Sequence, residues 1–176
     1  ANAMVFDRAA RHLWITGGPT GSLYHVGPDG GPVATAASGY ATMAADTTMP
    51  VRVYVVNGIA IDSNGVIYTA NTGTGEITRI LIGAGYTPAS TATFARDPRL
   101  VGADGLSMDG QGNLWVDANF RNTLARVGPD GTVTIVASST PDGNYADSTM
   151  VPAHPQTGAG NALRFPAEMT RIGNTM

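Results

Sequence analysis

Three segments of the sequence repeat the same arrangement of oxygen-bearing side chains. Each segment begins with an amide or a carboxylate, at Asn2, Asn57 or Asp104. Five residues later each has an aspartate, at Asp7, Asp62 or Asp109. Amide and carboxylate oxygens are the donors that a hard cation such as Ca²⁺ gathers in shells of about six to eight. The alternative is that an Asn-Gly or Asp-Gly pair only starts each strand with a turn.

The elements around these residues also repeat. The segments read "NAMVFDRAARHLWIT", "NGIAIDSNGVIYTA" and "DGLSMDGQGNLWVDA", each an alternating strand, a turn and a second strand. The second strand carries an aromatic residue, Trp14, Tyr68 or Trp115, which we expect in the core between repeats. A third strand follows in each copy, and turns such as Pro129-Asp130-Gly131 lead to a fourth. In the second copy, residues 83–100 are instead predicted to form a long connection before the outer strand.

Four short strands recurring about every 50 residues are typical of a β-propeller blade. The observed intervals are 55 residues (Asn2 to Asn57) and 47 residues (Asn57 to Asp104). The sequence therefore predicts an all-β fold, a β-propeller of four-stranded antiparallel blades. We expect one domain over 1–176, with blades at approximately 2–50, 51–100 and 101–140 and an incomplete fourth unit at 161–176.

Propellers close with at least about four blades, so three blades and a stub predict an incomplete ring. A longer chain or other subunits would then supply the remainder. The first strand of each blade lines the central channel of a propeller. We therefore expect Asn2, Asn57 and Asp104 to converge at the channel mouth, although they lie far apart in the sequence.

Two of these stretches resemble a known family. "VNGIAID" and "ADGLSMDGQGNLWVDA" are similar to blades of the regucalcin (senescence marker protein), gluconolactonase and lactonase family. The resemblance implies a six-bladed ring with one catalytic divalent metal in the channel, Ca²⁺ being the first candidate. It implies that Asn57 and Asp104 are metal ligands and that Asp104 can act as general base. The family's first-blade ligand is a Glu, for which Asn2 stands here or which lies outside the chain; Glu168 is one position out of register.

The function that follows is a metal-dependent hydrolase of lactones or related esters, acting on a small molecule. A bound cation would polarise the carbonyl and activate water. Asn71 and Asn119 follow the second strands and would bind substrate hydroxyls at the same mouth. Their alternative role is as loop residues in turn conformations.

The same repeat pattern is also compatible with two other functions. One is a non-catalytic binding module of the NHL-repeat type. The other is a lyase, because "GNLWVDANFRNTLARVGPDGTVT" resembles repeats of the virginiamycin B lyases, which need a His and a Glu at the mouth. His12 and His25 are expected to be structural or to lie at the surface, which leaves His154 as the histidine to test.

The amino-acid composition argues against several classes of binding partner and metal site. The net charge is -3 and basic residues form no run, which argues against nucleic acid or an anionic membrane as partner. No apolar stretch approaches the ~20 residues that span a bilayer. Cysteine is absent, so disulfides and thiolate metal sites are excluded. The start "ANAM" either follows signal cleavage, which would make the protein secreted or periplasmic, or is a boundary within a longer sequence.

Overall fold

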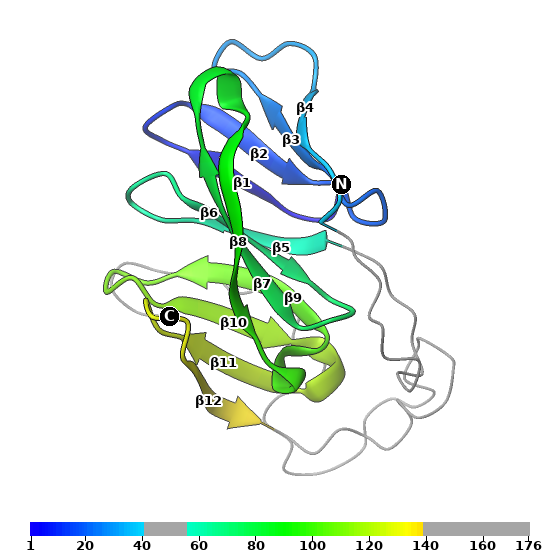
Figure 1. The fold of residues 1–176 in the computed structure, drawn as a ribbon, viewed down its shortest axis with the longest axis vertical. Coiled ribbons are helices and arrows are strands. Elements are labelled where there is room, and N and C mark those ends of the chain that lie inside the picture. The colour runs from blue at the N-terminus through cyan, green and yellow to red at the C-terminus, as the bar shows by residue number, and fades with distance from the viewer. Residues whose placement is uncertain (41–55, 139–176) are drawn as a thin grey trace.

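The computed structural model describes residues 1–40 and 56–138, which form three four-stranded antiparallel sheets (Figure 1). Blade 1 consists of β1 (Met4–Asp7), β2 (His12–Thr16), β3 (Leu23–Val26) and β4 (Ala34–Ala37). Blade 2 consists of β5 (Val56–Ile61), β6 (Ile67–Asn71), β7 (Glu76–Ile82) and β8 (Pro88–Arg96). Blade 3 consists of β9 (Ala103–Met108), β10 (Leu114–Ala118), β11 (Thr123–Val127) and β12 (Val133–Ser138). In each blade the strands are hydrogen-bonded in chain order, which confirms the predicted all-β propeller architecture.

Helix within this part of the chain is limited to short 3-10 turns: η1 (Ala84–Tyr86), η2 (Pro98–Leu100) and η3 (Asn119–Arg121). None of the described helices has the length and apolar character needed to cross a membrane. The predicted fourth unit at 161–176, with Glu168, and the loop with His154 lie outside the described residues.

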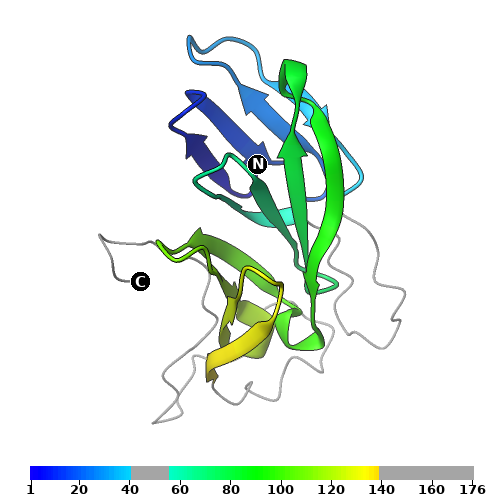
Figure 2. The same cartoon turned by 60° about the vertical axis from the view of Figure 1, so that its left-hand side comes forward.

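The first strand of every blade is the innermost one, as the repeat predicts. β5 lies between β1 and β9 and contacts both, and the sheets fan outward from these three strands (Figure 2). The inner strands line a cavity of about 750 Å³ towards the ends that carry Asp7 and Asp62. The opposite end of the same strands carries Asn57 and Asp104, and we call this end the mouth.

The core consists of two layers between neighbouring blades. Because side chains alternate across a strand, β5 sends Ile59 towards blade 1 and Ala60 towards blade 3. Trp14 is 1% exposed in the first layer and Tyr68 is 6% exposed in the second, which confirms their predicted place between blades. Trp115 is half-buried.

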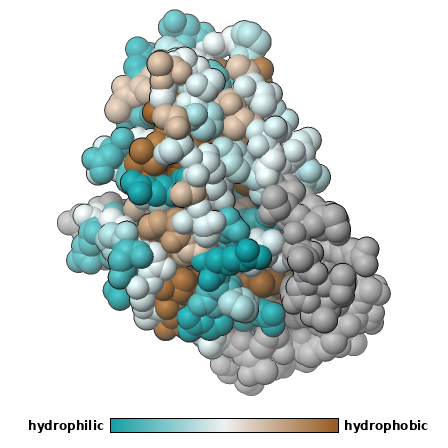
Figure 3. Space-filling view, viewed as in Figure 1, coloured by the Kyte–Doolittle hydropathy of each residue, from teal (hydrophilic) through white to brown (hydrophobic). Residues whose placement is uncertain are grey.

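Some apolar side chains stay on the surface. On β1, Met4 is 63% exposed and Phe6 is 53% exposed, while Val5 between them packs in the core layer shared with blade 2. In the view of Figure 3, apolar areas of this kind are separated by polar ones.

The prediction that residues 83–100 form a long connection is wrong. Nine of these residues form β8, which pairs with β7 along its length. The sequence "PASTATFAR" gave no apolar alternation because most of β8 is exposed to solvent, so small and hydroxyl side chains suffice there. An outer strand covered on neither face carries little hydrophobic signal.

Candidate functional site

Asn57 and Asp104 occupy equivalent irregularities of the inner strands. In blade 2, residues 57 and 58 of β5 face the single residue 70 of β6. In blade 3, residues 104 and 105 of β9 face the single residue 117 of β10. Such two-against-one insertions are β-bulges, which re-aim a side chain and occur often beside active sites. The recurring amide or carboxylate is thus the first residue of a bulge in both blades.

Blade 1 has a related arrangement at Asn2. The backbone N–H of Asn2 donates to the carbonyl of Thr16 (2.8 Å), while the N–H of Thr16 donates to the carbonyl of Ala3 (2.9 Å). Asn2 and Ala3 therefore both face Thr16. Asn2 is exposed, and its side chain lies beside Gly18, where an added Cβ would be 3.2 Å from its Oδ1. Its predicted place at the same end of the inner strands is thus observed, and its role as a ligand stays a prediction.

The glycine after Asn57 is required by a close approach between blades. A Cβ at Gly58 would collide with the carbonyl oxygen of Asp104 and lie 2.9 Å from Cγ of Leu106. The hydroxyl of Thr16 also donates to the carbonyl of Asn57 (2.6 Å), which ties blade 1 to this point. Gly58 therefore lets the two bulges touch, and this contact brings Asn57 and Asp104 onto adjacent backbones.

Asn119 is the residue that contacts Asp104 directly. It begins η3, it is 5% exposed, and its Nδ2 donates to Oδ2 of Asp104 (2.8 Å). Its backbone N–H donates to the carbonyl of Gly102 (2.9 Å), which fixes the start of the turn. Its Oδ1 is buried and accepts no hydrogen bond from the described residues. The side chain thus orients Asp104 with its nitrogen and keeps an oxygen for another partner.

Asp117 is a further carboxylate here that the sequence patterns did not single out. It is fully buried, and its Oδ1 accepts a hydrogen bond from the backbone N–H of Gly105 (3.0 Å). It therefore stabilises the bulge that carries Asp104. The available signal was an acidic residue inside the otherwise apolar strand "LWVDA", because a buried charge needs a specific partner.

The side chains at the mouth offer oxygen atoms, which are the ligand type that a hard cation prefers. Asp104 offers a carboxylate, and Asn57 and Asn119 offer amide oxygens, one of them buried and unused. Oxygen donors of this kind are those that Ca²⁺ prefers. In the described part of the chain, His, Cys, Asp and Glu nowhere gather in a group of three that could hold a metal. A cation here would therefore depend on amide oxygens and on water to complete its shell.

Asn71 lies at the corresponding place after β6 but is used differently. Its Oδ1 accepts hydrogen bonds from the backbone N–H groups of Gly73 (3.0 Å) and Thr74 (3.2 Å). Its Nδ2 donates to the carbonyl of Tyr40 (3.2 Å). The side chain is buried and closes the turn between β6 and β7, so its oxygen is already engaged, unlike that of Asn119.

The aspartates five residues further along lie at the opposite end of the same strands and close hairpin turns. Oδ1 of Asp62 accepts hydrogen bonds from the backbone N–H groups of Asn64 and Val66, both at 2.9 Å. Asp7 and Asp109 accept two backbone N–H groups in the same way. These aspartates are therefore turn residues and not part of the mouth.

Asp109 makes the largest set of contacts among them. Its Oδ2 also accepts hydrogen bonds from Nδ2 of Asn113 (2.8 Å) and from Nε1 of Trp115 (3.0 Å). Burial raises the pKa of Asp109, but the hydrogen bonds from Asn113, Trp115 and the backbone of Gln111 together outweigh it and lower the pKa to about 2. The carboxylate is thus ionised, and both of its oxygens accept hydrogen bonds from the protein.

The two described histidines lie together in blade 1. The ring centroids of His12 and His25 are 5.6 Å apart, and Tyr86 from blade 2 stacks on His12 at 3.8 Å. Burial lowers the pKa of His25, and the neighbouring His12 lowers it further. His12 pairs with Asp7, so the cluster lies towards the end opposite the mouth. The structure supports a packing role for both rings.

The structure is similar in fold to several proteins of known structure. No family model matches the chain, and no curated protein matches it. A gluconolactonase from Xanthomonas campestris has a TM-score of 0.56 at 22% identity, over 78% of this chain and 46% of that protein. A calcium-binding protein, regucalcin, from Agrobacterium tumefaciens strain C58 has a TM-score of 0.57 at 20% identity, over 80% and 45%.

A virginiamycin B lyase from Staphylococcus aureus has a TM-score of 0.54 at 14% identity, over 76% of this chain and 39% of that protein. The chain spans less than half the length of each of these three proteins. The predicted resemblance is therefore confirmed as a structural one. The chain forms part of a β-propeller of the fold shared by gluconolactonase, regucalcin and virginiamycin B lyase.

Proposed function

We propose that this protein is a metal-dependent hydrolase of lactones or related esters, with its reaction centre at the mouth. The observation that carries the proposal is the Asp104 carboxylate, held by Asn119 beside a buried amide oxygen that no described residue uses. The fold shared with a gluconolactonase and with a calcium-binding regucalcin supports the same reading.

Two of the residues have a second task besides holding the cation in this proposal. Asp104, Asn57 and Asn119 hold the cation, and Asn2 at the equivalent position of blade 1 is the fourth and weakest candidate. When bound, a divalent cation such as Ca²⁺ polarises a lactone carbonyl and lowers the pKa of water. Asp104 takes the proton of the attacking water as general base. Asn119 orients the Asp104 carboxylate through its 2.8 Å hydrogen bond.

The test combines metal binding with hydrolysis. Calorimetric titration with Ca²⁺ should show a site that Asp104→Asn removes, because the substitution deletes the charged ligand of the set. Hydrolysis of a sugar lactone, followed by acid release, should fall by about a hundredfold or more in the same variant. Asp109→Asn is the matched control, since Asp109 lies at the other end of the same strand, and it should leave both readouts unchanged. Unaltered calcium binding and turnover in Asp104→Asn would refute the proposal.

The two alternatives predict different results in the same experiments. A lyase of the virginiamycin B type would need a histidine at the mouth, but the described His12 and His25 lie in blade 1 near Asp7. A non-catalytic binding propeller would show no turnover and no dependence on Asp104. Neither alternative has a specific contact in its favour comparable to the pairing of Asp104 with Asn119.

A further inference from the structure

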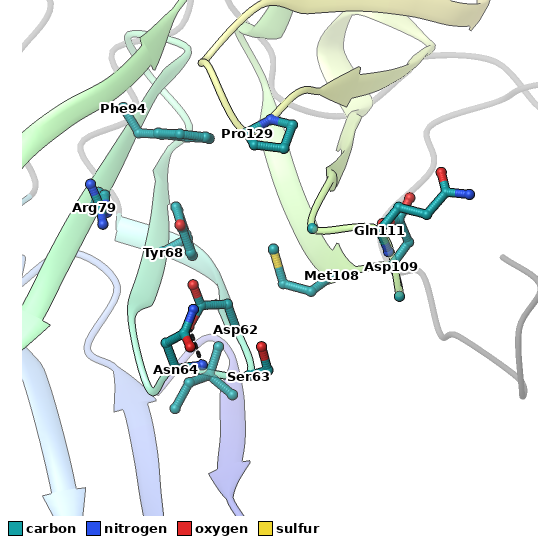
Figure 4. Close-up of a pocket in the computed structure, with 13 residues that line it drawn as sticks. Asp62, Ser63, Asn64, Tyr68, Arg79, Phe94, Met108, Asp109, Gln111 and Pro129 are labelled. Carbon is teal, nitrogen blue, oxygen red and sulfur yellow. Dashed lines mark hydrogen bonds between the residues drawn. The ribbon is translucent and has the colours of Figure 1, made fainter.

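A second cavity lies between blades 2 and 3, at the end away from Asp104. It measures about 540 Å³, and the hairpin turns after β5 and β9 form part of its wall (Figure 4). This volume falls within the range of about 300–1,000 Å³ typical of small-molecule sites. The proposed hydrolase centre uses none of its residues.

The cavity has a mixed lining, with an apolar part on each side. Tyr68 and Phe94 of blade 2 form an edge-to-face pair with ring centroids 5.0 Å apart. Met108 and Pro129 of blade 3 lie across the cavity from them (Figure 4). A Cβ at Gly131 would lie 2.5 Å from the carbonyl oxygen of Phe94, so the turn after β11 packs directly on β8. This contact holds the two walls at a fixed separation, as a preformed site for a flat ring requires.

Arg79 and Tyr68 supply hydrogen-bond donors to the cavity. Arg79 faces Tyr68 across the strands, and its side chain is hydrogen-bonded to the Tyr68 hydroxyl. A guanidinium has five N–H donors in a fork that fits a carboxylate. The phenol of Tyr68 is a second donor: burial raises its pKa, and the nearby Asp62 raises it further, although Arg79 opposes them.

The acidic groups of the cavity are occupied by the protein. Oδ1 of Asp62 accepts two backbone N–H groups, and both oxygens of Asp109 accept hydrogen bonds from its own turn and from Trp115. Hydrogen bonds within the protein therefore engage both oxygens of Asp109 and Oδ1 of Asp62. The ligand that complements the remaining groups carries acceptors and negative charge at one end and a ring at the other.

We propose that this cavity binds a small aromatic carboxylate, with its ring between Phe94 and Met108 and its carboxylate on Arg79 and the hydroxyl of Tyr68. The ligand enters from the side of Arg79, which is exposed at the rim. Binding here does not depend on the hydrolase centre, which lies at the other end of the inner strands.

The test uses benzoate and its neutral analogue benzamide as probes, with binding followed by NMR shift changes and by calorimetry. We expect saturable binding of benzoate, and Arg79→Gln should weaken it about tenfold or more by removing a bidentate charged partner. The same variant should leave benzamide binding unchanged, whereas Phe94→Ala should weaken both probes. Arg126→Gln is the matched control, because Arg126 pairs with Trp115 in blade 3 as Arg79 pairs with Tyr68 but does not line the cavity.

A second control separates the two proposals. Asp104→Asn should leave benzoate binding unchanged whether or not it abolishes hydrolysis. Failure of benzoate to bind, equal binding of benzamide and benzoate, or loss of benzoate binding in Asp104→Asn would each overturn the inference.

Discussion

The two ends of β9 carry the same side-chain type for different purposes. At the mouth, Asp104 sits on a β-bulge, and its Oδ2 accepts a hydrogen bond from Nδ2 of Asn119. At the other end, Asp109 accepts hydrogen bonds from two backbone N–H groups and two side chains of its own hairpin. Asp104 is thus oriented by a neighbouring turn, whereas the oxygens of Asp109 are used within its own hairpin.

The largest expected effect concerns the contact that makes the mouth. Gly58→Ala should lower the free energy of unfolding by about 3 kcal/mol or more, because the added methyl collides with the backbone of β9 at Asp104. Urea unfolding followed by circular dichroism measures this. Gly27→Ala is the control: its Cβ would meet no atom closer than 3.9 Å, and the change should stay below about 1 kcal/mol. Equal stabilities of the two variants would contradict the contact.

The next effect compares the two aspartates directly. Asp109→Ala should cost about 2–3 kcal/mol, because it leaves the donors of the turn and of Trp115 without their charged acceptor. Asp104→Ala should cost about 1 kcal/mol, because it removes the acceptor of the hydrogen bond from Nδ2 of Asn119. Unfolding curves of both variants in the absence of added metal check the order. A larger loss for Asp104→Ala would remove the distinction between the two ends.

The pH dependence of the unfolding free energy should also distinguish Asp109 from Asp104. The folded-state pKa of Asp109 is about 2, below the value of about 3.9 expected in the unfolded chain. Its contribution to stability is therefore fully present above about pH 4 and is lost as the pH falls through about 2. After allowance for solvent screening, this amounts to about 1–2 kcal/mol. The unfolding free energy of Asp109→Asn should lack this part of the pH dependence between about pH 2 and pH 5, and parallel profiles would contradict the assignment.

The smallest effect isolates one hydrogen bond. Trp115→Phe should cost about 1 kcal/mol, because it removes the Nε1 donor to Oδ2 of Asp109 and keeps most of the ring. In the Asp109→Ala background the same substitution should cost less than half as much. A double-mutant cycle on unfolding free energies measures this coupling. Additive losses would show that the indole acts through packing alone.

Much of the fold was predictable because the repeat is strong. The blade pattern gave the order of strands, the inner position of β1, β5 and β9, and the burial of Trp14 and Tyr68. β8 was missed because an outer strand exposed to solvent needs no apolar alternation. The hydrophobic signal thus reports burial, and it weakens wherever a strand leaves the core.

The candidate site was only partly predictable. The position of Asn57 and Asp104 at one end of adjacent inner strands followed from the repeat. The contact between Asn119 and Asp104 could not be predicted from the repeat, because it depends on the turn η3. The role of Asp117 could not be predicted either, because it depends on the bulge opposite it. Nor could spacing show that Asp62 and Asp109 close turns, since a fixed interval marks two ends of a strand without saying what each end does.

The bulges have a consequence for how such a protein can change. A bulge re-aims the side chain that it carries, so the local backbone acts together with the contacts of that side chain. Asn57 and Asp104 already differ in charge at matching positions of two blades, on backbones of the same shape. Exchanging Asn, Asp or Glu at these positions would therefore change the charge at the mouth, while the hairpins at the other end of the strands keep their own contacts. Gly58 fixes the spacing between these two positions.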